Sequence, residues 1–415
     1  MKILIKNIKG LVQVRDQHSP FIAGESMKEL PVLEDAWLAI EDGKIADYGS
    51  MAAWPGISDW SNLEIIDADG KYVFPSWVDS HTHLVYAGTR ESEFSDRLDG
   101  LSYEEIAAKG GGILNSAIKL QSAKEDELLS SAQKRLDSVI QMGTGAIEIK
   151  SGYGLTAEAE LKILRVIQQL RSQNDIPIKS TFLGAHAFPK AFKKNPDEYI
   201  RLIIDEMIPA IAQEGLAEYI DVFCESNYFS VDQSRQILNA GIAAGLRPKI
   251  HVNQFTSIGG IQLGVELNAL SVDHLEVMDE ADFTSLKKSQ TMPTLLPSCS
   301  LFIEIPYGPA RKMIDKGLPI ALATDYNPGS SPNGNMNLVN SLASIKMKMT
   351  AEETINASTI NGAYAMGLEK EIGSITRGKW ANIFFTKDIP SYGYLNYSFG
   401  ENCIDRVMIK GKFID

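Results

Sequence analysis

The sequence predicts an α/β protein whose main body is a TIM-type (β/α)8 barrel, with a small β-sandwich domain formed by both chain termini. In the middle of the chain, eight apolar runs of strand length alternate with amphipathic segments of helix length, which is the pattern of a parallel barrel. At both ends, short runs alternate apolar and polar residues around turn residues, which is typical of antiparallel strands. We expect residues 1–68 and 369–415 to form the sandwich and residues 69–368 to form the barrel.

The composition is that of an ordinary globular protein, with 44% hydrophobic and 22% charged residues among 415. A formal net charge of -13 argues against binding to nucleic acids and offers no basic face to an anionic membrane. The three cysteines are far apart and form no CxxC pair, which fits a reducing compartment. The first residues read as a strand, and no apolar run approaches the roughly 20 residues of a membrane span. We therefore expect a cytoplasmic enzyme.

The sandwich is expected to begin with a strand over residues 2–8 and a hairpin over residues 37–48. The hairpin turn is Glu41-Asp42-Gly43-Lys44, a sequence that favours the backbone of a tight turn. Near the C-terminus, residues 383–385 and 407–413 carry the same strand pattern around Gly and Asn. Because two β-rich ends flank a different middle, we expect them to join into one small domain.

The barrel strands are expected at residues 72–79, 146–150, 178–186, 219–225, 248–253, 269–276, 291–297 and 320–325. The helices expected between them include residues 125–142, 157–173, 197–213, 232–244 and 351–366. The alternative architecture, a doubly wound open sheet, would require a glycine-rich phosphate loop after an early strand, and no such pattern follows any of these runs. Gly110, Gly111 and Gly112 are expected to form a flexible turn or lid hinge rather than a phosphate-binding loop.

Polar residues mark the carboxyl ends of these strands, where a barrel of this class carries its catalytic groups. His81 and His83 end the first run, and the period of two along a strand places both on one face. Later runs end, in chain order, at His186, Glu225, His251, His274 and Asp325. Five of the six histidines therefore lie at strand ends. The sixth, His18, is expected on the surface of the N-terminal region.

Four of these side chains are the predicted metal ligands: His81, His83, His251 and Asp325. Three imidazoles and one carboxylate suit zinc or ferrous iron better than magnesium or calcium. A metal of this kind acidifies a bound water, and Asp325 could also take the proton of that water. His274 could hydrogen-bond the water or the oxyanion that forms on attack. Any one of these histidines could be an ordinary hydrogen-bonded core residue, but together they indicate a hydrolytic metal site.

This pattern resembles the amidohydrolase superfamily, whose members are metal-dependent (β/α)8 barrels with a β-sandwich built from both chain ends. The pair at His81 and His83 alone would indicate only the superfamily. Two segments are more specific than this pair: Lys-Ser-Gly-Tyr-Gly-Leu at residues 150–155 and Asn-Pro-Gly-Ser at residues 327–330. Residues 184–186, 221–225 and 273–276 support the same resemblance. Through them, nearly the whole chain is similar to the branch that hydrolyses the cyclic amide of 4-imidazolone-5-propanoate.

The resemblance implies the metal ligands already predicted, one divalent zinc or iron, and a homodimer. It implies that the product is N-formimidoyl-L-glutamate, formed in the third step of histidine degradation to glutamate. It implies that Arg90 binds the substrate carboxylate, for which a guanidinium is well shaped. Tyr103 and Ser330 match positions that help to hold that carboxylate. The positions that line the ring or contact the product match Tyr153, His186, Asn327 and Gly329.

The chain departs from the superfamily pattern at a few positions. Gln254 stands where many relatives have an acidic residue, so we place it in the catalytic group as a binder of the ring and not as a proton shuttle. Ser76 replaces a usual glycine and Asn382 a usual aspartate, both away from the proposed chemistry. The fourth run ends at Cys224 and Glu225 without a lysine, so a second metal bridged by a carboxylated lysine is not expected. Glu225 is expected to support the pocket.

Two alternatives stay open at this point. A deaminase on the same scaffold, acting on an aminoimidazole or a pterin, would also use one metal. Gln254 counts against it, because such a deaminase usually needs an acid there, and Arg90 with Ser330 favours an anionic substrate. A barrel that binds a metal without catalysis would lack a ligand or an acid–base residue, and none is missing.

Overall fold

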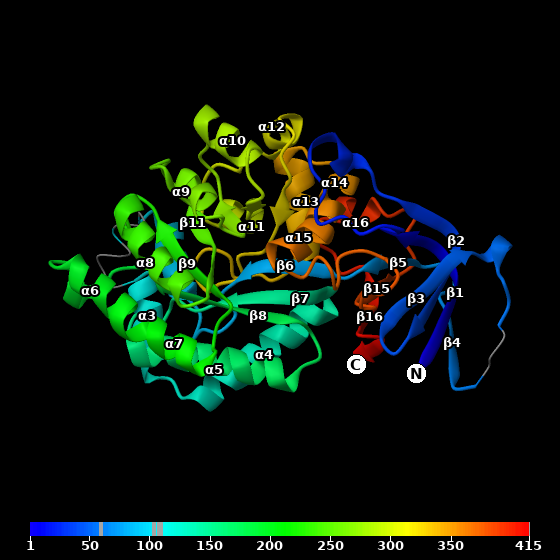
Figure 1. Ribbon diagram of the computed structural model, residues 1–415, viewed down its shortest axis with the longest axis horizontal. Coiled ribbons are helices and arrows are strands. Elements are labelled where there is room, and N and C mark those ends of the chain that lie inside the picture. Colours follow the sequence, from blue (N-terminus) through cyan, green and yellow to red (C-terminus); the bar gives the residue numbers. More distant parts are fainter. Residues whose placement is uncertain (58–60, 102–104, 106–110, 415) are drawn as a thin grey trace.

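The structure is a computed structural model that describes residues 1–57, 61–101, 105 and 111–414. It contains two sheets, one from both termini and one from the middle of the chain (Figure 1). The terminal sheet has the strand order β17-β16-β15-β5-β1-β2-β3, with β4 beside β1. Its strands are β1 (Lys2–Val12), β2 (Val32–Glu41), β3 (Lys44–Ser50), β4 (Leu63–Asp67), β5 (Tyr72–Pro75), β15 (Ile383–Thr386), β16 (Ile404–Ile409) and β17 (Lys412–Ile414).

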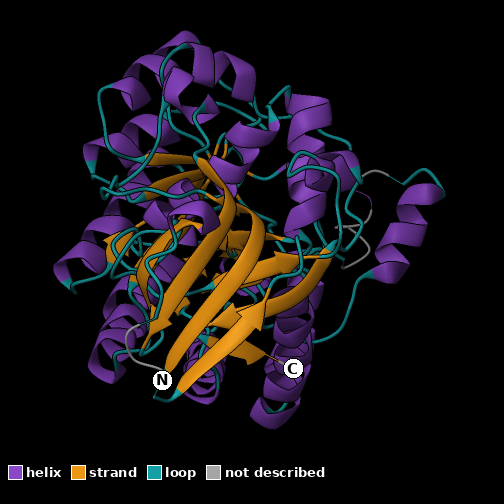
Figure 2. Ribbon diagram, turned by 90° about the vertical axis from the view of Figure 1, so that its right-hand side faces the viewer, coloured by secondary structure: helices purple, strands orange, loops and turns teal. Residues whose placement is uncertain are grey.

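The predicted joining of the two chain ends is confirmed. The strand β15 pairs antiparallel with β5, so the C-terminal strands continue the sheet that the N-terminal strands begin. The predicted hairpin is present between β2 and β3, and both turn residues, Asp42 and Gly43, have positive φ as a tight hairpin turn requires. Figure 2, in which the terminal sheet faces the viewer, shows its long strands in front of helices of the barrel.

The run over residues 72–79, expected as one barrel strand, is divided between the two sheets. Its first half is β5 in the terminal sheet, and the barrel strand β6 (Trp77–Thr82) begins after Ser76. The backbone N–H of Ser76 donates to the carbonyl of Asn382 (2.9 Å), and the Asn382 side chain donates to Gly145 in the barrel (2.9 Å). The two residues that depart from the superfamily pattern therefore meet at the junction of the sheets. The domain limits at residues 68 and 368 stay a prediction.

The barrel consists of parallel strands in the order β14-β13-β12-β11-β9-β8-β7-β6, with a short β10 (Arg247–Pro248) beside β9. The strands that follow β6 are β7 (Thr144–Lys150), β8 (Ile178–Ala185), β9 (Tyr219–Cys224), β11 (Ile250–Val252), β12 (Ser271–His274), β13 (Met292–Leu295) and β14 (Ala321–Leu322). The backbone N–H of Asp325 donates to the carbonyl of His81 (3.0 Å), and that of His83 donates to Tyr326 (2.9 Å). These bonds join the segment after β14 to β6 and bring Asp325 beside the two histidines. The predicted fold class is confirmed.

The helices surround the barrel and carry their apolar faces towards the strands. They are α1 (Glu91–Leu98), α3 (Ile113–Ser122), α4 (Glu125–Gln141), α5 (Ala157–Gln173), α6 (Pro196–Leu202), α7 (Ile208–Glu214), α8 (Val231–Ala243), α9 (Gly260–Glu266), α10 (Glu280–Lys287), α11 (Pro297–Phe302), α12 (Ala310–Asp315), α13 (Met336–Met347), α14 (Ala351–Ser358), α15 (Ile360–Ala365) and α16 (Tyr394–Tyr397). In α5, the side chains of Ile163, Leu164, Ile167 and Leu170 recur at helical spacing and are buried. Among the described residues, no helix combines the length and the apolar character needed to cross a membrane.

Two of the predicted helices are interrupted. The segment expected as a helix over residues 197–213 contains a π-helical turn, Ile203–Met207, between α6 and α7. Pro209 has no backbone N–H to donate to the carbonyl four residues earlier, which explains why regular α-helical bonding fails here. The segment 351–366 is likewise two helices, because Thr359 has a non-helical backbone (φ -122°, ψ -87°) between α14 and α15.

Candidate active site and metal centre

The site is built around His81 and His83 at the carboxyl end of β6. Both side chains are buried. The Nδ1 atom of His81 lies 2.7 Å from Oδ2 of Asp273, and Nδ1 of His83 lies 3.3 Å from the carbonyl oxygen of Ser151. Because both partners are acceptors, Nδ1 carries the proton in each ring and the Nε2 lone pair is available. Each ring is therefore oriented as a metal-ligating histidine is.

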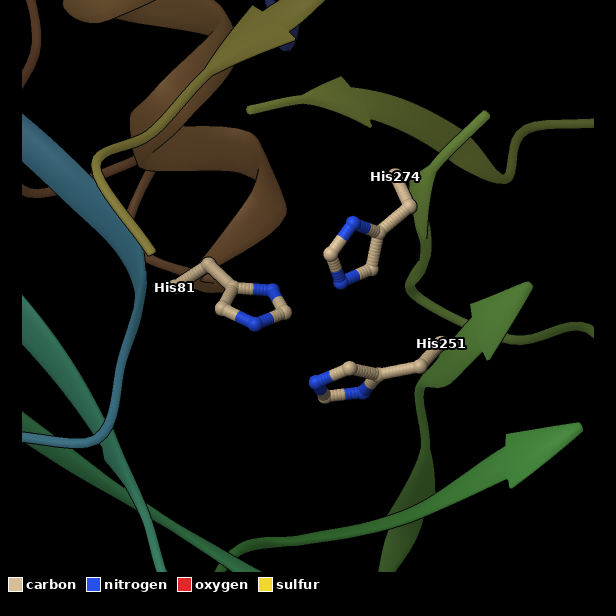
Figure 3. A group of neighbouring side chains, drawn as sticks. All are labelled: His81, His251 and His274. Atoms are coloured by element: carbon tan, nitrogen blue, oxygen red, sulfur yellow. The ribbon is translucent and has the colours of Figure 1, made fainter. Parts of the chain in front are cut away.

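The predicted ligands lie together although they come from three different strand ends. Figure 3 shows the rings of His81, His251 and His274 pointing towards one another, and one ring nitrogen of each lies within 4.8 Å of the others. Oδ1 of Asp325 lies 3.5 Å from Nε2 of His81 and 3.7 Å from Nε2 of His83. His81 therefore belongs to two groups with metal-ligand spacing, one with His251 and His274 and one with His83 and Asp325.

The unsatisfied polar atoms of this cluster fit a metal ion. The Nε2 atoms of His81 and His251 are buried and have no hydrogen-bond partner among the described residues. A buried polar atom without a partner is unfavourable, and a divalent cation would satisfy both nitrogens at once. Burial, with added repulsion from neighbouring cationic groups, lowers the pKa of His81 and of His83 well below 6.5. Both imidazoles are therefore in the neutral form that binds metals.

Two residues at the centre have an unusual backbone. His274 has φ of +87° and Asp325 has φ of +55°, a region that residues other than glycine rarely adopt. Such conformations persist only where the surrounding structure enforces them, and they gather at functional sites. Here the backbone bond from Asp325 to His81 holds one of the two in place. The two residues with a left-handed backbone, His274 and Asp325, are thus also residues whose side chains point into the cluster.

Two buried carboxylates behind the cluster were not predicted from the sequence. Asp273 contacts His81, and Oδ2 of Asp221 lies 3.0 Å from Nδ1 of His251 while its Oδ1 accepts the His251 backbone N–H (3.1 Å). A carboxylate behind a ligating histidine fixes the ring and raises its basicity. The signal was present, because a charged residue inside an apolar strand run must have a buried partner.

His274 lies beside the four proposed ligands. Its Nδ1 atom lies 3.4 Å from Oε1 of Glu276, which is also buried. Burial lowers the pKa of His274, but the carboxylates of Glu276, Asp325 and Asp273 outweigh this effect and the net pKa is raised. A histidine that protonates readily next to the cluster is suited to stabilise negative charge that develops there.

Arg90 lies at the start of α1 and is held by Glu93. The Glu93 carboxylate accepts hydrogen bonds from Nε (2.7 Å) and Nη2 (2.5 Å) of Arg90, and also from the backbone N–H of Gly112 (3.1 Å). On the other side, a Cβ atom at Gly329 would lie only 2.0 Å from Nη1 of Arg90. A Cβ atom at position 329 would therefore displace the Arg90 guanidinium, which lies directly against the Gly329 backbone. The structure brings these two predicted substrate contacts together, and Glu93 was not predicted from the sequence.

The segment after Asp325 folds back on itself through Asn327. Oδ1 of Asn327 accepts the backbone N–H groups of Gly329 and Ser330 (2.8 Å each). Its Nδ2 atom donates to the carbonyl of Asp325 (2.6 Å) and to Oγ of Ser330 (2.8 Å). Oγ of Ser330 in turn donates to Oδ2 of Asp325 (3.2 Å). This turn connects three predicted substrate contacts directly to a predicted metal ligand.

His186 and Tyr153 form one wall next to His83. The His83 and His186 rings are stacked, with centroids 5.3 Å apart and planes 11° apart, and the Tyr153 ring lies 5.4 Å from that of His186. Burial lowers the pKa of His186 to about 3, so the ring is neutral at physiological pH. Flat neutral rings are suited to lie against a planar heterocycle. Tyr103, also predicted to contact substrate, lies outside the described residues, as does Gly110.

Gln254 closes the cluster on another side. Its Nε2 atom donates to the Sγ atom of the buried Cys299 (3.4 Å), a residue that the sequence did not single out. The loop behind it is held by Glu225, whose carboxylate accepts the backbone N–H groups of Phe255 (2.9 Å) and Thr256 (3.2 Å). Glu225 therefore supports the segment that carries Gln254, and its expected support of neighbouring ligands or of the substrate pocket stays a prediction. Cys224, which precedes Glu225, is buried, and His18 is exposed as predicted.

Comparison with known proteins agrees with this geometry. A model of the amidohydrolase family matches residues 237–414. The chain is 60% identical to an imidazolonepropionase of Christiangramia forsetii and 59% identical to one of Flavobacterium johnsoniae, over 100% of each chain. It is 41% identical to an imidazolonepropionase of Alkaliphilus metalliredigens, over 99% of this chain and 97% of the relative.

Solved structures show the same fold at much lower identity. A zinc-bound adenosine deaminase from Xanthomonas campestris matches with a TM-score of 0.72 at 17% identity, over 99% of this chain and 92% of the other. A guanine deaminase from E. coli matches with a TM-score of 0.71 at 13% identity, over 100% and 99%. These likenesses concern the fold, whereas the curated relatives match along the whole sequence. The chain therefore belongs to the imidazolonepropionase family of the amidohydrolase superfamily.

Proposed function

We propose that this chain hydrolyses the cyclic amide bond of 4-imidazolone-5-propanoate to N-formimidoyl-L-glutamate, the third step of histidine degradation to glutamate. The observation that carries the proposal is a buried cluster centred on His81, which forms one group with His251 and His274 and another with His83 and Asp325. The Nε2 atoms of His81 and His251 are unsatisfied. Full-length relatives at about 60% identity carry the imidazolonepropionase name, which supports the same activity here.

The cluster would hold one divalent transition metal, and its donor set suits zinc and iron alike. When bound, such a metal supplies Lewis acidity, which acidifies a water molecule and polarises a carbonyl group. Asp325 accepts the proton of the attacking water and carries it to the ring nitrogen as the C–N bond breaks. His274 hydrogen-bonds the oxyanion that forms on the former carbonyl oxygen. Water is added across one bond, and no further reactant is required.

The remaining side chains bind and orient the substrate. Arg90 binds the propionate carboxylate through its fork of N–H groups, with Tyr103 and Ser330 beside it. The imidazolone ring lies against the wall of Tyr153 and His186, and Gln254 hydrogen-bonds the ring. Asn327 and Gly329 shape the segment between the ring and the carboxylate. An amide at position 254 cannot move a proton, so proton transfer rests on Asp325 and His274.

The test is the loss of the imidazolone ultraviolet absorbance on adding metal-loaded protein. The proposal expects rapid loss of this absorbance, with N-formimidoyl-L-glutamate as the product and no release of ammonia. Unchanged absorbance, together with ammonia release from an aminoimidazole or a pterin, would replace the ring hydrolase by a deaminase. The expected homodimer and cytoplasmic location belong to the same proposal. Sedimentation velocity would measure the former and cell fractionation the latter.

A further inference from the structure

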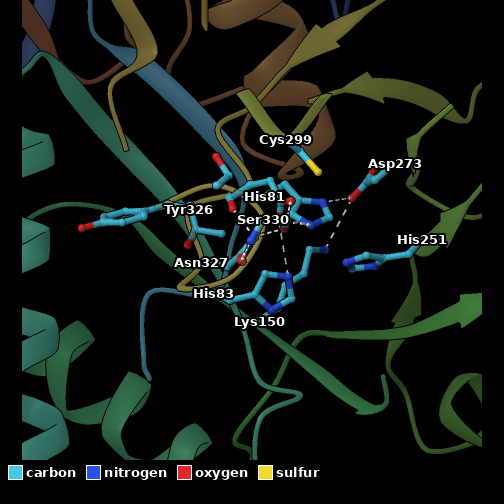
Figure 4. A network of polar contacts seen from close by, with 12 residues as sticks. His81, His83, Lys150, His251, Asp273, Cys299, Tyr326, Asn327 and Ser330 are labelled. Atoms are coloured by element: carbon cyan, nitrogen blue, oxygen red, sulfur yellow. Dashed lines mark hydrogen bonds and ion pairs between the residues drawn. The ribbon is translucent and has the colours of Figure 1, made fainter. Parts of the chain in front are cut away.

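Two lysines are fully buried beneath the histidine cluster, and only one of them reaches the carboxylates behind the rings. Lys150 ends β7, and Lys249 precedes β11; neither side chain has any exposed surface. Charged side chains are almost never fully buried unless they are paired. Figure 4 shows Lys150 next to His81, His83 and Asp273. None of the roles assigned above uses either lysine.

The contacts of Lys150 join the two halves of the metal centre. Its Nζ atom lies 2.7 Å from Oε1 of Glu148, 2.8 Å from Oδ2 of Asp221 and 3.5 Å from Oδ2 of Asp273. The same Oδ2 atoms contact the rings above: that of Asp221 lies 3.0 Å from Nδ1 of His251, and that of Asp273 lies 2.7 Å from Nδ1 of His81. One ammonium group therefore lies between the carboxylates that orient two proposed ligands.

We propose that Lys150 is a positioning residue that holds Asp221 and Asp273 so that the Nε2 atoms of His251 and His81 both point at the metal. The inference rests on the metal site of the proposed function but not on the identity of the substrate. In this proposal, the Lys150 ammonium group lies behind the two carboxylates. It fixes the distance between His81 and His251, which come from separate strands.

The reason is electrostatic. Two carboxylates that approach one point in a water-free interior repel each other strongly, because the low dielectric constant does not screen them. The Lys150 ammonium balances that repulsion and gives each carboxylate a fixed partner. Without it, Asp221 or Asp273 would turn away, and a rotated carboxylate no longer fixes its histidine.

Lys249 provides a matched comparison within the same buried network. It also bonds to Glu148, but its other partners are the backbone carbonyls of Ser80 (3.2 Å) and Ala365 (3.1 Å). It makes no ion pair with the carboxylates that contact His81 and His251 among the described residues. Removing either lysine leaves a buried carboxylate poorly compensated. Lys249 also acts electrostatically on Asp273 from beyond ion-pair distance, whereas among the described residues only Lys150 forms ion pairs with both Asp221 and Asp273.

The experiment compares Lys150→Met with Lys249→Met in the full-length protein. Zn²⁺ dissociation constants are measured by chelator competition, and the visible spectrum of the Co²⁺-substituted protein reports ligand geometry. We expect Lys150→Met to weaken Zn²⁺ binding by about 10- to 100-fold and to change the Co²⁺ spectrum, as loss of an outer support does. Lys249→Met, with a comparable loss of thermal stability, should change the dissociation constant less than about threefold.

A double-mutant cycle with Asp221→Asn removes the ambiguity of a general loss of stability. If Lys150 acts through Asp221, the losses in Zn²⁺ affinity are not additive in Lys150→Met/Asp221→Asn, but they are additive in Lys249→Met/Asp221→Asn. Equal losses in the two lysine variants, or additivity in both cycles, would overturn the inference. If Lys150→Met does not fold, Lys150→Gln, which keeps a donor but not the charge, takes its place. Wild-type protein that binds Zn²⁺ but does not hydrolyse the imidazolone would refute the substrate and leave this test intact.

Discussion

Gly329 and Arg90 show how a single backbone position can control a substrate contact. The guanidinium lies so close to residue 329 that there is no space for a Cβ atom. We predict that Gly329→Ala displaces Arg90 and raises KM for the imidazolone at least about tenfold, since one lost charge-assisted bond is worth roughly 1.5–3 kcal/mol. Metal content should not change. Arg90→Ala should raise KM at least as much.

The control is Gly393→Ala. Gly393 has a helical backbone (φ -66°), and a Cβ atom there would meet nothing closer than 3.9 Å. The KM of the Gly393→Ala enzyme should equal that of the wild type. A Gly329→Ala enzyme with unchanged KM would show that substrate binding does not depend on the present position of the Arg90 guanidinium.

His186 gives a second prediction for a single residue, which concerns how the stability of the fold depends on pH. Burial lowers its pKa from 6.5 to about 3. Below pH 6.5 the unfolded chain therefore binds a proton here that the folded chain does not, so this residue lowers stability progressively as the pH falls. The loss is about 1.4 kcal/mol for each pH unit, or about 2 kcal/mol at pH 5.

The measurement compares the unfolding of metal-free wild type and His186→Gln, which cannot accept this proton. The wild type should lose stability relative to the variant between pH 7 and pH 5. His18→Gln, at an exposed position, controls for the loss of a histidine as such. A stability difference between wild type and His186→Gln that is independent of pH would contradict the buried, neutral ring.

The sequence allowed the prediction of the cluster residues because histidines at strand ends are rare and conspicuous. It indicated that Asp221, Asp273 and Lys150 need buried partners, because each lies within a run that reads as an apolar strand, but it did not identify those partners. Their partners are distant in the chain: Lys150 pairs with a carboxylate 71 residues later, Asp221. Pairing of this kind depends on which strands become neighbours, and strand neighbours follow from the closed barrel and not from local pattern.

At the scale of elements, the loop after β11 depends on β9. Glu225 at the end of β9 accepts the N–H groups of Phe255 and Thr256, so one strand end holds the loop of its neighbour. We predict that Glu225→Gln destabilises the protein by about 1–3 kcal/mol, because an amide cannot accept all of these bonds. KM should also rise as Gln254 shifts, while metal content stays constant. Thermal unfolding and steady-state kinetics measure both effects.

The comparison for this variant is Glu266→Gln, which removes an exposed ion pair with Arg235. Exposed pairs contribute little, so its stability should change by less than about 1 kcal/mol. Equal and small effects in the two variants would show that Glu225 does not hold the loop.

Local sequence pattern was sufficient to locate the barrel strands and the five helical segments named between them. It failed where a run continues across a boundary that only tertiary contacts define. Residues 72–79 read as one strand, yet hydrogen bonds to β15 place the first half in the other sheet. The break at Thr359 was also not predicted, although Ser358, Asn361 and Gly362 beside it are weak helix formers. Pro209 is the exception, because its missing N–H was visible in the sequence.

At the scale of the whole molecule, closure of the barrel assembles the site. Backbone bonds between Asp325, His81, His83 and Tyr326 join the last strand segment to the first, so ligands more than 200 residues apart become neighbours. The terminal sheet is attached at Ser76, immediately before β6, and the Asn382 side chain bonds to Gly145 in β7. Folding of the two chain ends is thereby connected to the strand that carries His81 and His83.

The most direct test of this account is a metal titration of metal-free protein, followed by the loss of imidazolone absorbance. We predict no activity without metal and a linear rise as Zn²⁺ or Fe²⁺ is added, with a break at one ion per chain. Asp325→Asn should stay inactive throughout. Full activity in metal-free protein, a break at two ions per chain, or no loss of absorbance at any metal content would contradict a single hydrolytic metal held by His81, His83, His251 and Asp325.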